Sequence, residues 1–441
     1  MEVAVSRLLL PISIDDRFYP LKKRPYSMQK RYPPRFSLLA CSVVVISLTT
    51  ASLTAAEQPV VTWTVQDAPD YRYHFLEKTK TTKLLDATPE TGTFNLHGFL
   101  CYYQGILFAS WDNHVRDENS SGQHGVFRFS ADEGKTWSKQ KQLFPPLADY
   151  VPASETKTPK PFQTSQGFAE VDGKLYAVTC VDRSLKKKMY RFNEVSRTRI
   201  GLLSREVGVD GTLGPIFWLS DSAPKPESGY PTIPAGTPSL VAKLNAYFKE
   251  PANLPQLLFG PRQWPDSDDE HRMTEPTQPW RLKDGIWVRL YRNQGTVHGT
   301  TRAETEASRP RRHYASFSLD DGKTWSAPTR TNFPDTGARA NAGQLPNGYY
   351  YVINNPLPMS SRQGGRQMLA ISLAKDGLNF DRMAVIKFVA PPQRYEGKSK
   401  GAGGFQYPHS VVVGKNLWII YSVNKEDVEV VRVPLAQLSK R

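Results

Sequence analysis

Residues 130–137 read Ser-Ala-Asp-Glu-Gly-Lys-Thr-Trp, and residues 318–325 read Ser-Leu-Asp-Asp-Gly-Lys-Thr-Trp. Both stretches fit the pattern S-x-D-x-G-x-T-W without a gap. Because Ser and Asp side chains bond nearby backbone N–H groups and Gly accepts a positive φ, the pattern predicts a tight hairpin turn. The Thr and Trp would then begin the next strand with a large apolar anchor. Two copies of one turn indicate a chain built from repeated β units.

Weaker copies of the turn set the length of the repeat. Residues 204–217 (SREVGVDGTLGPIF) and 373–380 (LAKDGLNF) resemble the pattern around an Asp-Gly pair. The spacing of the four starts predicts about six units of roughly 60 residues each, within the range of β-propellers. The apolar, aromatic-rich runs between turns read as strands. These runs cover residues 173–181, 286–292, 348–354, 416–423 and 428–433.

Composition supports an all-β chain with one helix. The 35 Pro and 30 Gly interrupt helices often, and 39% hydrophobic residues suffice for a core. Residues 238–253 (PSLVAKLNAYFKEPAN) carry apolar side chains at near-helical spacing. The sequence therefore predicts a six-bladed propeller over residues 57–441, a single domain with a short helical insertion near 238–253. We expect residues 60–65 (VVTWTV) to close the ring by joining the last blade.

The first 56 residues have the features of an export signal. Lys30, Arg31 and Arg35 precede an apolar run over residues 38–48, and small residues end at Ala56. Met28 is a plausible true start. We expect cleavage near Ala56 and a mature protein that is periplasmic or extracellular and carries no membrane segment.

The net charge and the cysteine content limit the classes of ligand and cofactor that the protein could bind. The chain has a net charge of +15; without residues 1–56 it would keep 49 basic and 39 acidic residues, a net charge of +10. The basic residues are scattered, which favours an acidic glycan over nucleic acid. The sequence contains no CxxC pair and no HExxH motif, so we expect no metal and no cofactor. Cys101 and Cys180 either pair or remain thiols.

The repeated turn, its period and the export signal resemble the sialidase (neuraminidase) superfamily of six-bladed propellers, in which this turn is called the Asp box. The resemblance covers about residues 60 to 435. It implies an exo-acting, retaining glycoside hydrolase with a Tyr nucleophile, an activating Glu, a mobile Asp as acid/base and three Arg that bind the substrate carboxylate. A neutral Tyr suits a sugar whose own carboxylate would repel an anionic nucleophile.

Three of these roles have candidates by position. Tyr407 precedes the turn and apolar strand of the last repeat, as the family's nucleophile does. Arg292 ends a strand-like run ahead of the second Asp box, and Arg366 or Arg362 precedes the turn at residues 373–380. The resemblance assigns these Arg residues to the substrate carboxylate.

The chain departs from the family at two positions. Asn95 stands where the first Arg is expected, although His97 lies nearby, and Arg281 stands where the activating Glu is expected. Glu275, six residues earlier, is the substitute. For the acid/base, Asp112, Asp117 and Glu118 compete on the loop before the first Asp box, with Asp117 and Glu118 at the best distance from it.

Two other classes of function remain open. A non-catalytic glycan-binding propeller would share the fold. A polysaccharide lyase would use a His or Tyr base and an Arg that neutralises a carboxylate, and His298, His313 and His409 are its candidates. The product separates the classes: a hydrolase adds water, a lyase leaves an unsaturated sugar that absorbs in the ultraviolet, and a binder changes nothing.

Overall fold

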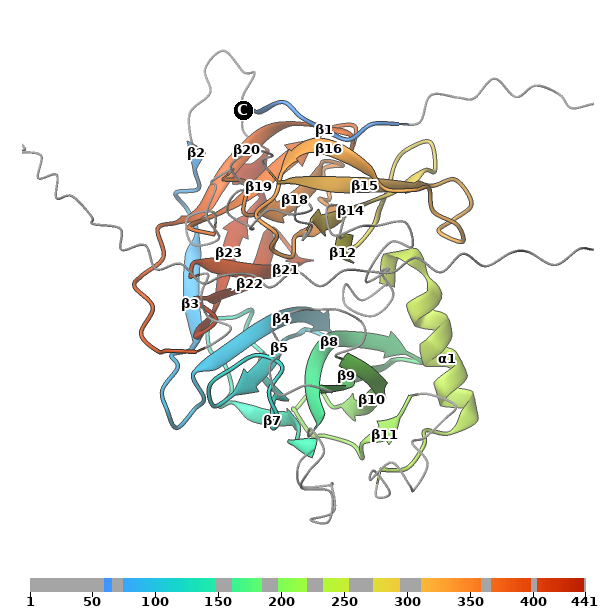
Figure 1. The fold of residues 1–441 in the computed structure, drawn as a ribbon, viewed down its shortest axis with the longest axis vertical. Coiled ribbons are helices and arrows are strands. Elements are labelled where there is room, and N and C mark those ends of the chain that lie inside the picture. The colour runs from blue at the N-terminus through green and yellow to red at the C-terminus, as the bar shows by residue number, and fades with distance from the viewer. Residues whose placement is uncertain are drawn as a thin grey trace, which may run out of the picture. The chain divides into compact units, whose positions relative to one another are not determined.

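The computed structural model describes residues 59–65, 74–147, 161–184, 197–219, 233–253, 273–293, 311–357, 366–397 and 403–439. These residues form five β-sheets, here numbered I to V (Figure 1). The predicted signal segment and its cleavage site lie outside the described residues. None of the described helices has the length and hydropathy needed to cross a bilayer.

Three sheets are built from consecutive strands between residues 94 and 334. Sheet I contains β4 (Phe94–Tyr103), β5 (Ile106–His114), β6 (His124–Ser130) and β7 (Lys141–Phe144). Sheet II contains β8 (Pro161–Val171), β9 (Lys174–Ser184), β10 (Arg197–Val207) and β11 (Phe217–Trp218). Sheet III contains β12 (Met273–Pro276), β13 (Trp280–Arg281), β14 (Trp287–Asn293), β15 (Arg312–Ser318) and β16 (Thr329–Pro334).

The other two sheets combine C-terminal strands with N-terminal ones. Sheet IV contains β17 (Asn341–Gln344), β18 (Tyr350–Asn354), β19 (Met368–Ala374) and β20 (Asn379–Phe388), together with β1 (Thr62–Trp63) and β2 (His74–Phe75). Sheet V contains β21 (Phe405–Val413), β22 (Asn416–Val423), β23 (Asp427–Pro434) and β3 (Lys80–Leu85). The last element of the described residues is the short helix α4 (Leu435–Leu438).

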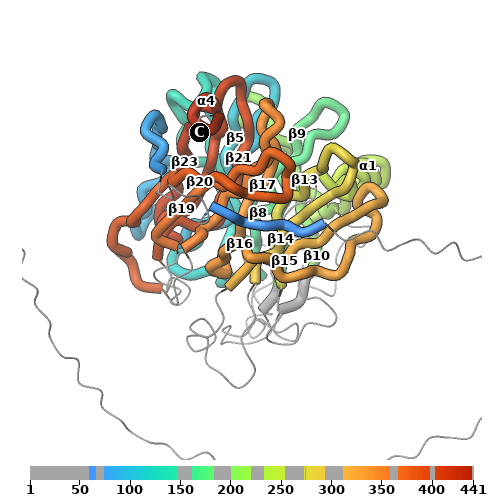
Figure 2. The backbone as a smooth tube through the Cα atoms, turned by 90° about the horizontal axis from the view of Figure 1, so that it is seen from above, coloured from blue at the N-terminus to red at the C-terminus, as the bar shows by residue number. Residues whose placement is uncertain are grey.

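The closing strand differs from the one that the sequence predicts. Thr62 and Trp63 pair in parallel with Asn379 and Phe380 of β20, so β1 joins sheet IV and not the last sheet. The blue N-terminal strand lies among orange strands in both views (Figures 1 and 2). The last sheet is completed by β3, which pairs antiparallel with β23. The prediction for residues 60–65 was wrong in the sheet it named, because β3 offers the longer strand to that open edge.

The repeated turns occupy equivalent places. Each Asp box and each weaker copy connects the third and fourth strands of its sheet, in sheets I to IV. In the first box, the Ser130 hydroxyl donates to Asp132 and accepts from the Gly134 N–H, each at 2.8 Å, and Asp132 accepts from the Thr136 N–H and hydroxyl. The second box repeats these bonds residue for residue. The turn function predicted from the motif is therefore the one observed.

The Trp residues of the two boxes are half-buried, not buried as large core residues. Trp137 packs at the edge of the cluster between sheets I and V. Trp325 lies under the guanidinium of Arg289, 3.8 Å from its ring centre. Both therefore anchor the turn at the margin of a sheet interface and not within it.

The core consists of separate apolar clusters between neighbouring sheets. One cluster joins sheets I and II, others join sheets IV and V, III and IV, and V and I. Turn glycines fit into these interfaces: a Cβ on Gly134 would come within 2.3 Å of Trp418 in sheet V, and one on Gly211 within 2.2 Å of Phe129 in sheet I. Sheets stacked in this cyclic order form a β-propeller.

A helical segment stands between sheets II and III. Helix α1 (Pro238–Lys249), confirmed where the sequence predicts it, packs Val241, Leu244 and Phe248 against sheet II. The turn glycine of sheet III, Gly322, faces Pro251 of the adjoining 3₁₀ turn (Pro251–Asn253), where a Cβ would come within 2.2 Å. This segment therefore packs against the turn of sheet III, as a neighbouring sheet packs against the turns of sheets I and II. The described residues form five sheets, whereas the spacing of the turns predicts six.

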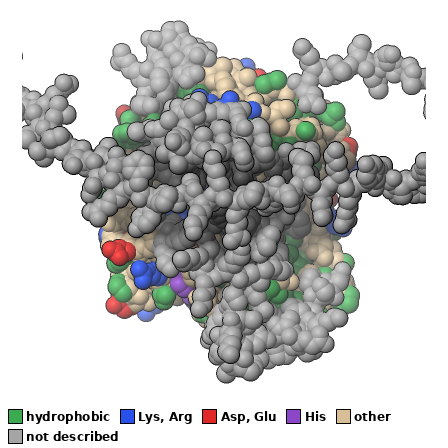
Figure 3. Space-filling model, viewed as in Figure 1, with side chains coloured by type: hydrophobic (Ala, Val, Ile, Leu, Met, Phe, Trp, Pro, Cys, Tyr) green, Lys and Arg blue, Asp and Glu red, His purple; other side chains and the backbone are tan. Residues whose placement is uncertain are grey.

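Charged residues of both signs share the surface. On the face shown in Figure 3, Lys or Arg, Asp or Glu and His side chains stand close together at the visible lower left edge. This mixture agrees with the scattered charges of the sequence.

Candidate functional site

Three non-glycine residues with left-handed backbone lie in first strands of different sheets. His97 in β4, Glu275 in β12 and Tyr407 in β21 have φ values of 53°, 47° and 56°. Each coincides with a shift in strand register, at Leu96/Phe99, Thr274/Pro276 and Gln406/His409. Such bulges re-aim a side chain, and the strained conformation persists only where packing enforces it.

Tyr407 and Glu275 meet at one nitrogen of Arg292. The Nη1 atom of Arg292 donates to the Tyr407 hydroxyl at 2.9 Å and also to the Glu275 carboxylate. Burial disfavours ionisation of Glu275, but the charges of Arg292, His97 and Arg339 together outweigh it and lower the pKa of that carboxyl. The phenol and the carboxylate therefore share one guanidinium nitrogen.

Two further guanidinium groups surround the Tyr407 ring. Arg339 and Arg366 place their Cζ atoms 5.5 and 5.7 Å from its centre, and Arg292 lies at 5.4 Å. Arg339 donates from Nη2 to the Gly98 carbonyl, whereas Arg366 donates to Gln406 and to the Gly337 carbonyl.

Some donors of this trio are buried without an acceptor. Among the residues that the structure describes, none accepts from Nε or Nη1 of Arg339 or from Nε of Arg366. Burial lowers the pKa of Arg339 to about 10, so the group still carries its charge at neutral pH. Buried unsatisfied charged donors are costly, and their presence indicates a site for an anionic ligand.

His97 connects the Tyr407 cluster to two acids. Its ring lies 5.2 Å from the Tyr407 ring, its Nδ1 lies 2.7 Å from Asp112 Oδ2, and its Nε2 lies 3.8 Å from Glu118 Oε1. Asp112 is fully buried and also accepts from the Ser165 N–H at 2.6 Å. These bonds fix the orientation of the imidazole.

Glu118 is held by Lys425, whose Nζ lies 2.6 Å from its carboxylate. Burial opposes the charged form of Glu118, but Lys425, assisted by His97, outweighs it and lowers the pKa of this carboxyl to about 2. Lys425 and Asn424 have φ values of 59° and 58° and form the tight turn between β22 and β23.

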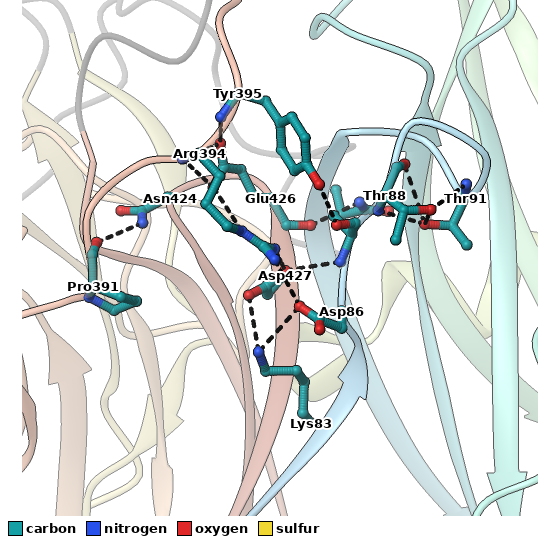
Figure 4. Close-up of polar contacts among 12 residues, drawn as sticks. Lys83, Asp86, Thr88, Thr91, Pro391, Arg394, Tyr395, Asn424, Glu426 and Asp427 are labelled. Carbon is teal, nitrogen blue, oxygen red and sulfur yellow. Dashed lines mark hydrogen bonds and ion pairs between the residues drawn. The ribbon is translucent and has the colours of Figure 1, made fainter.

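A polar network outside the cluster fixes that turn (Figure 4). The Glu426 carboxylate accepts from the backbone N–H groups of Arg394 and Tyr395, and Asn424 donates to the Pro391 carbonyl at 2.8 Å. The Arg394 guanidinium in turn binds Asp427 and Asp86 (Figure 4). The position of Lys425 is therefore determined by contacts on both sides of its hairpin.

The structure brings together seven residues that the sequence singled out: Tyr407, Arg292, Arg366, Glu275, Glu118, His97 and Asp112. Asn95 is buried, and its side-chain amide bonds to neighbouring protein groups. It donates to the carbonyls of Gly92 and Glu426 and accepts from Trp111 and Asn113. These bonds occupy the amide of Asn95, so Asn95 does not take the substrate-binding role of the expected Arg.

The remaining candidates have other contacts. The Asp117 carboxylate is 4.0 Å from Arg116, and Arg281 is an exposed partner of Asp321. His313 contacts the Tyr291 carbonyl, and His409 accepts from the Leu100 N–H. Arg362 and His298 lie outside the described residues.

Sequence reasoning missed Arg339 and Lys425. Arg339 follows Gly337 and Ala338 and precedes Ala340, directly before β17, and a charged residue within such a run of small ones was the available signal. Lys425 carried no signal, because only the hairpin turn brings it to Glu118.

Metal-binding clusters and reactive thiols would add further chemistry to the site region. Within the described ranges, no three His, Cys, Asp or Glu side chains gather as a metal site. Cys101 and Cys180 are free thiols, and burial raises the pKa of Cys101 to about 12, which leaves it unreactive.

The comparisons agree with this architecture. A family model described as a BNR repeat-like domain matches residues 261–419. A solved structure described as a sialidase superposes with a TM-score of 0.65 at 22% identity, over 85% of this chain and 35% of that one. This chain thus spans about a third of that protein's length.

Two further solved structures are less similar. Trypanosoma rangeli sialidase in complex with 2,3-difluorosialic acid has a TM-score of 0.47 at 11% identity, over 83% of this chain and 60% of that one. A mutant of NanB sialidase from Streptococcus pneumoniae has a TM-score of 0.47 at 11% identity, over 85% and 72%. No curated protein sequence matches the chain. The chain therefore has the β-propeller fold of that sialidase structure, and its residues 261–419 match the BNR repeat-like family.

Proposed function

We propose that the protein is an exported, sialidase-like glycoside hydrolase that binds an acidic glycan at the Tyr407 cluster and uses Tyr407 as a retaining nucleophile. The observation that carries the proposal is the shared nitrogen of Arg292, which joins the Tyr407 hydroxyl to Glu275. A hydroxyl that accepts from a guanidinium is stabilised as it becomes an oxyanion.

The charge of the cluster supports an acidic sugar. Arg339 and Arg366 have donors without an acceptor in the described part of the chain, and both are buried beside the Tyr407 ring. A sugar carboxylate would accept from these donors through charge-assisted bonds. An anionic nucleophile at this place would repel that carboxylate, whereas a neutral Tyr does not.

The test is turnover on a panel of glycans that end in acidic sugars. We expect release of the terminal acidic sugar by the wild type, and a loss of several orders of magnitude in Tyr407→Phe, because only the reacting hydroxyl is removed. Tyr351→Phe is the matched control: it also removes a buried, hydrogen-bonded hydroxyl, which contacts Ser410 at 2.9 Å. Full turnover by Tyr407→Phe would overturn the proposal.

A polysaccharide lyase is the second candidate, because the His97 ring centre lies 5.2 Å from that of Tyr407 and Asp112 contacts the imidazole. In a lyase, these groups would remove the proton next to a carboxylate that Arg339 and Arg366 neutralise. Ultraviolet absorbance of the same reactions decides between them, because only the lyase forms an unsaturated sugar. Binding without any product would leave a glycan-binding propeller.

A further inference from the structure

We propose that His97, positioned by Asp112, is the proton donor to the leaving group and the base that later activates water. This inference rests on the proposed hydrolase function and names the acid/base that the proposal leaves open. The sequence favours a carboxylate of the loop before the first Asp box, and the geometry assigns the role to the imidazole instead.

The contacts of the His97 imidazole suit a group that transfers a proton. Asp112 Oδ2 lies 2.7 Å from Nδ1, so Nε2 is the nitrogen that would exchange protons with a substrate. Asp112 cannot itself reach a substrate, because it is fully buried and its oxygens bind the Ser165 N–H, Gln123 and His97. The left-handed backbone at His97, with φ of 53°, turns the ring onto Tyr407.

The neighbouring carboxylates are less suited to donate a proton. Lys425 holds Glu118 in its ionised form, and the hairpin that carries Lys425 is fixed by the network of Figure 4. The Asp117 carboxylate is 4.0 Å from Arg116 on its own loop. The Glu118 carboxylate lies 3.8 Å from Nε2, so it borders the nitrogen that would transfer the proton.

The charged groups around His97 come from several elements. Asp112 lies on β5, Glu118 on the following loop, Glu275 on β12, and Tyr407 on β21. Asp112 and Glu118 therefore lie against the imidazole, while Arg292 binds both Glu275 and Tyr407.

The reaction balances with these groups alone. In the first step, the Tyr407 oxygen bonds to the anomeric carbon and its proton passes to Glu275, while the bond to the leaving oxygen breaks and that oxygen takes the proton from His97 Nε2. In the second step, neutral His97 takes a proton from water, and the water oxygen bonds to the anomeric carbon. The bond to Tyr407 breaks, and its oxygen regains the proton from Glu275.

The test compares two glycosides of the same acidic sugar. One has a nitrophenol leaving group, which departs without a proton, and the other has a sugar alcohol, which requires one. The variant is His97→Asn, because Asn tolerates positive φ and transfers no proton at this site. We expect kcat/KM to fall by about 10²- to 10⁴-fold with the sugar leaving group and by less than about tenfold with nitrophenol.

Azide supplies a second readout. It attacks the glycosyl-enzyme without a base, so we expect it to raise kcat of His97→Asn on the nitrophenyl glycoside and to form a glycosyl azide. His124→Asn, a change to a His on β6 that contacts the Gly122 carbonyl, is the control and should match the wild type in both assays. Thermal melts of both variants confirm that they fold.

The outcomes separate the two proposals. A wild type that cleaves neither glycoside overturns the proposed function and this inference with it. A wild type that cleaves both, with an equal loss for the two leaving groups in His97→Asn or no loss at all, overturns the role of His97 and leaves the hydrolase intact. Asp112→Asn should show the same leaving-group dependence as His97→Asn, because Asp112 acts through the imidazole.

Discussion

Arg292 donates from Nη1 to the Tyr407 hydroxyl at 2.9 Å, although 115 positions separate the two residues in the chain. The bond joins β14 of sheet III to β21 of sheet V, and the same nitrogen also binds Glu275. Because the hydroxyl oxygen accepts from a fixed cation, negative charge that develops on this oxygen is stabilised without rearrangement.

Replacing Arg292 by Lys tests that bond. A Lys keeps the charge but loses the planar fork that serves two acceptors at once, so we expect kcat on an active glycan to fall by about 10²- to 10³-fold. Arg289→Lys, on the same strand, should leave kcat unchanged, because Arg289 stacks on Trp325 and Tyr291. Equal activities of the two variants would argue against a catalytic role for Arg292.

Arg339→Met separates ligand binding from stability. Arg339 is buried with two nitrogens that lack an acceptor among the described residues, so an apolar side chain of similar length should leave the free energy of unfolding unchanged or raise it. Binding of an acidic sugar should weaken by about 2 to 5 kcal/mol, since a buried charge pair is lost. The measurements are denaturant unfolding and calorimetric titration.

A sugar without a carboxylate is the control for the Arg339→Met binding experiment. The same sugar with its carboxylate reduced to an alcohol should bind the wild type and Arg339→Met equally. A variant that unfolds more easily and binds both sugars as the wild type does would make Arg339 a structural residue.

Two glycines test whether the Asp-box turn packs against the next sheet. Gly134 and Gly414 both have positive φ, 72° and 56°, but a Cβ on Gly134 would meet Trp418 at 2.3 Å and one on Gly414 would meet nothing within 4 Å. Gly414→Ala should cost about 1 kcal/mol for the backbone alone. Gly134→Ala should cost about 1 to 3 kcal/mol more. Equal costs in denaturant unfolding would contradict the packing.

His409 predicts an acid-sensitive stability. Burial, reinforced by the charge of Arg339, lowers its pKa from 6.5 to about 3. The unfolded chain therefore binds a proton that the folded chain excludes, and stability is lost as pH falls from about 6.5 toward 3. We expect the wild type to lose more stability than His409→Gln between pH 7 and pH 4, as measured by urea unfolding. Parallel losses in the two proteins would show that His409 does not contribute.

The sequence predicts the turns better than it predicts the site. Ser130 and Asp132 form their bonds within five residues, so the pattern contains the whole structure. Tyr407 was found through its place before a strand. The pairing of β3 with β23 depends on competition between strands more than 340 positions apart, which no local pattern records.

The site residues that the sequence did not predict were missed for one reason. Lys425 reaches the cluster through the tight turn between β22 and β23, and Arg339 reaches it from the segment directly before β17, so neither position follows from a strand pattern. Asn95, chosen by position, is instead occupied by the carbonyls of Gly92 and Glu426. Position along a strand identifies which residues approach the centre, whereas the bulge decides which side chains face it.

The most direct test of the central claim, that Tyr407 forms a bond to the sugar, is proton NMR of the first product released from an active glycan. Two successive displacements at the anomeric carbon retain its configuration. We predict that the initial signal belongs to the anomer present in the substrate, before mutarotation. An inverted anomer, or the vinyl proton of an unsaturated sugar, would contradict a Tyr407 nucleophile.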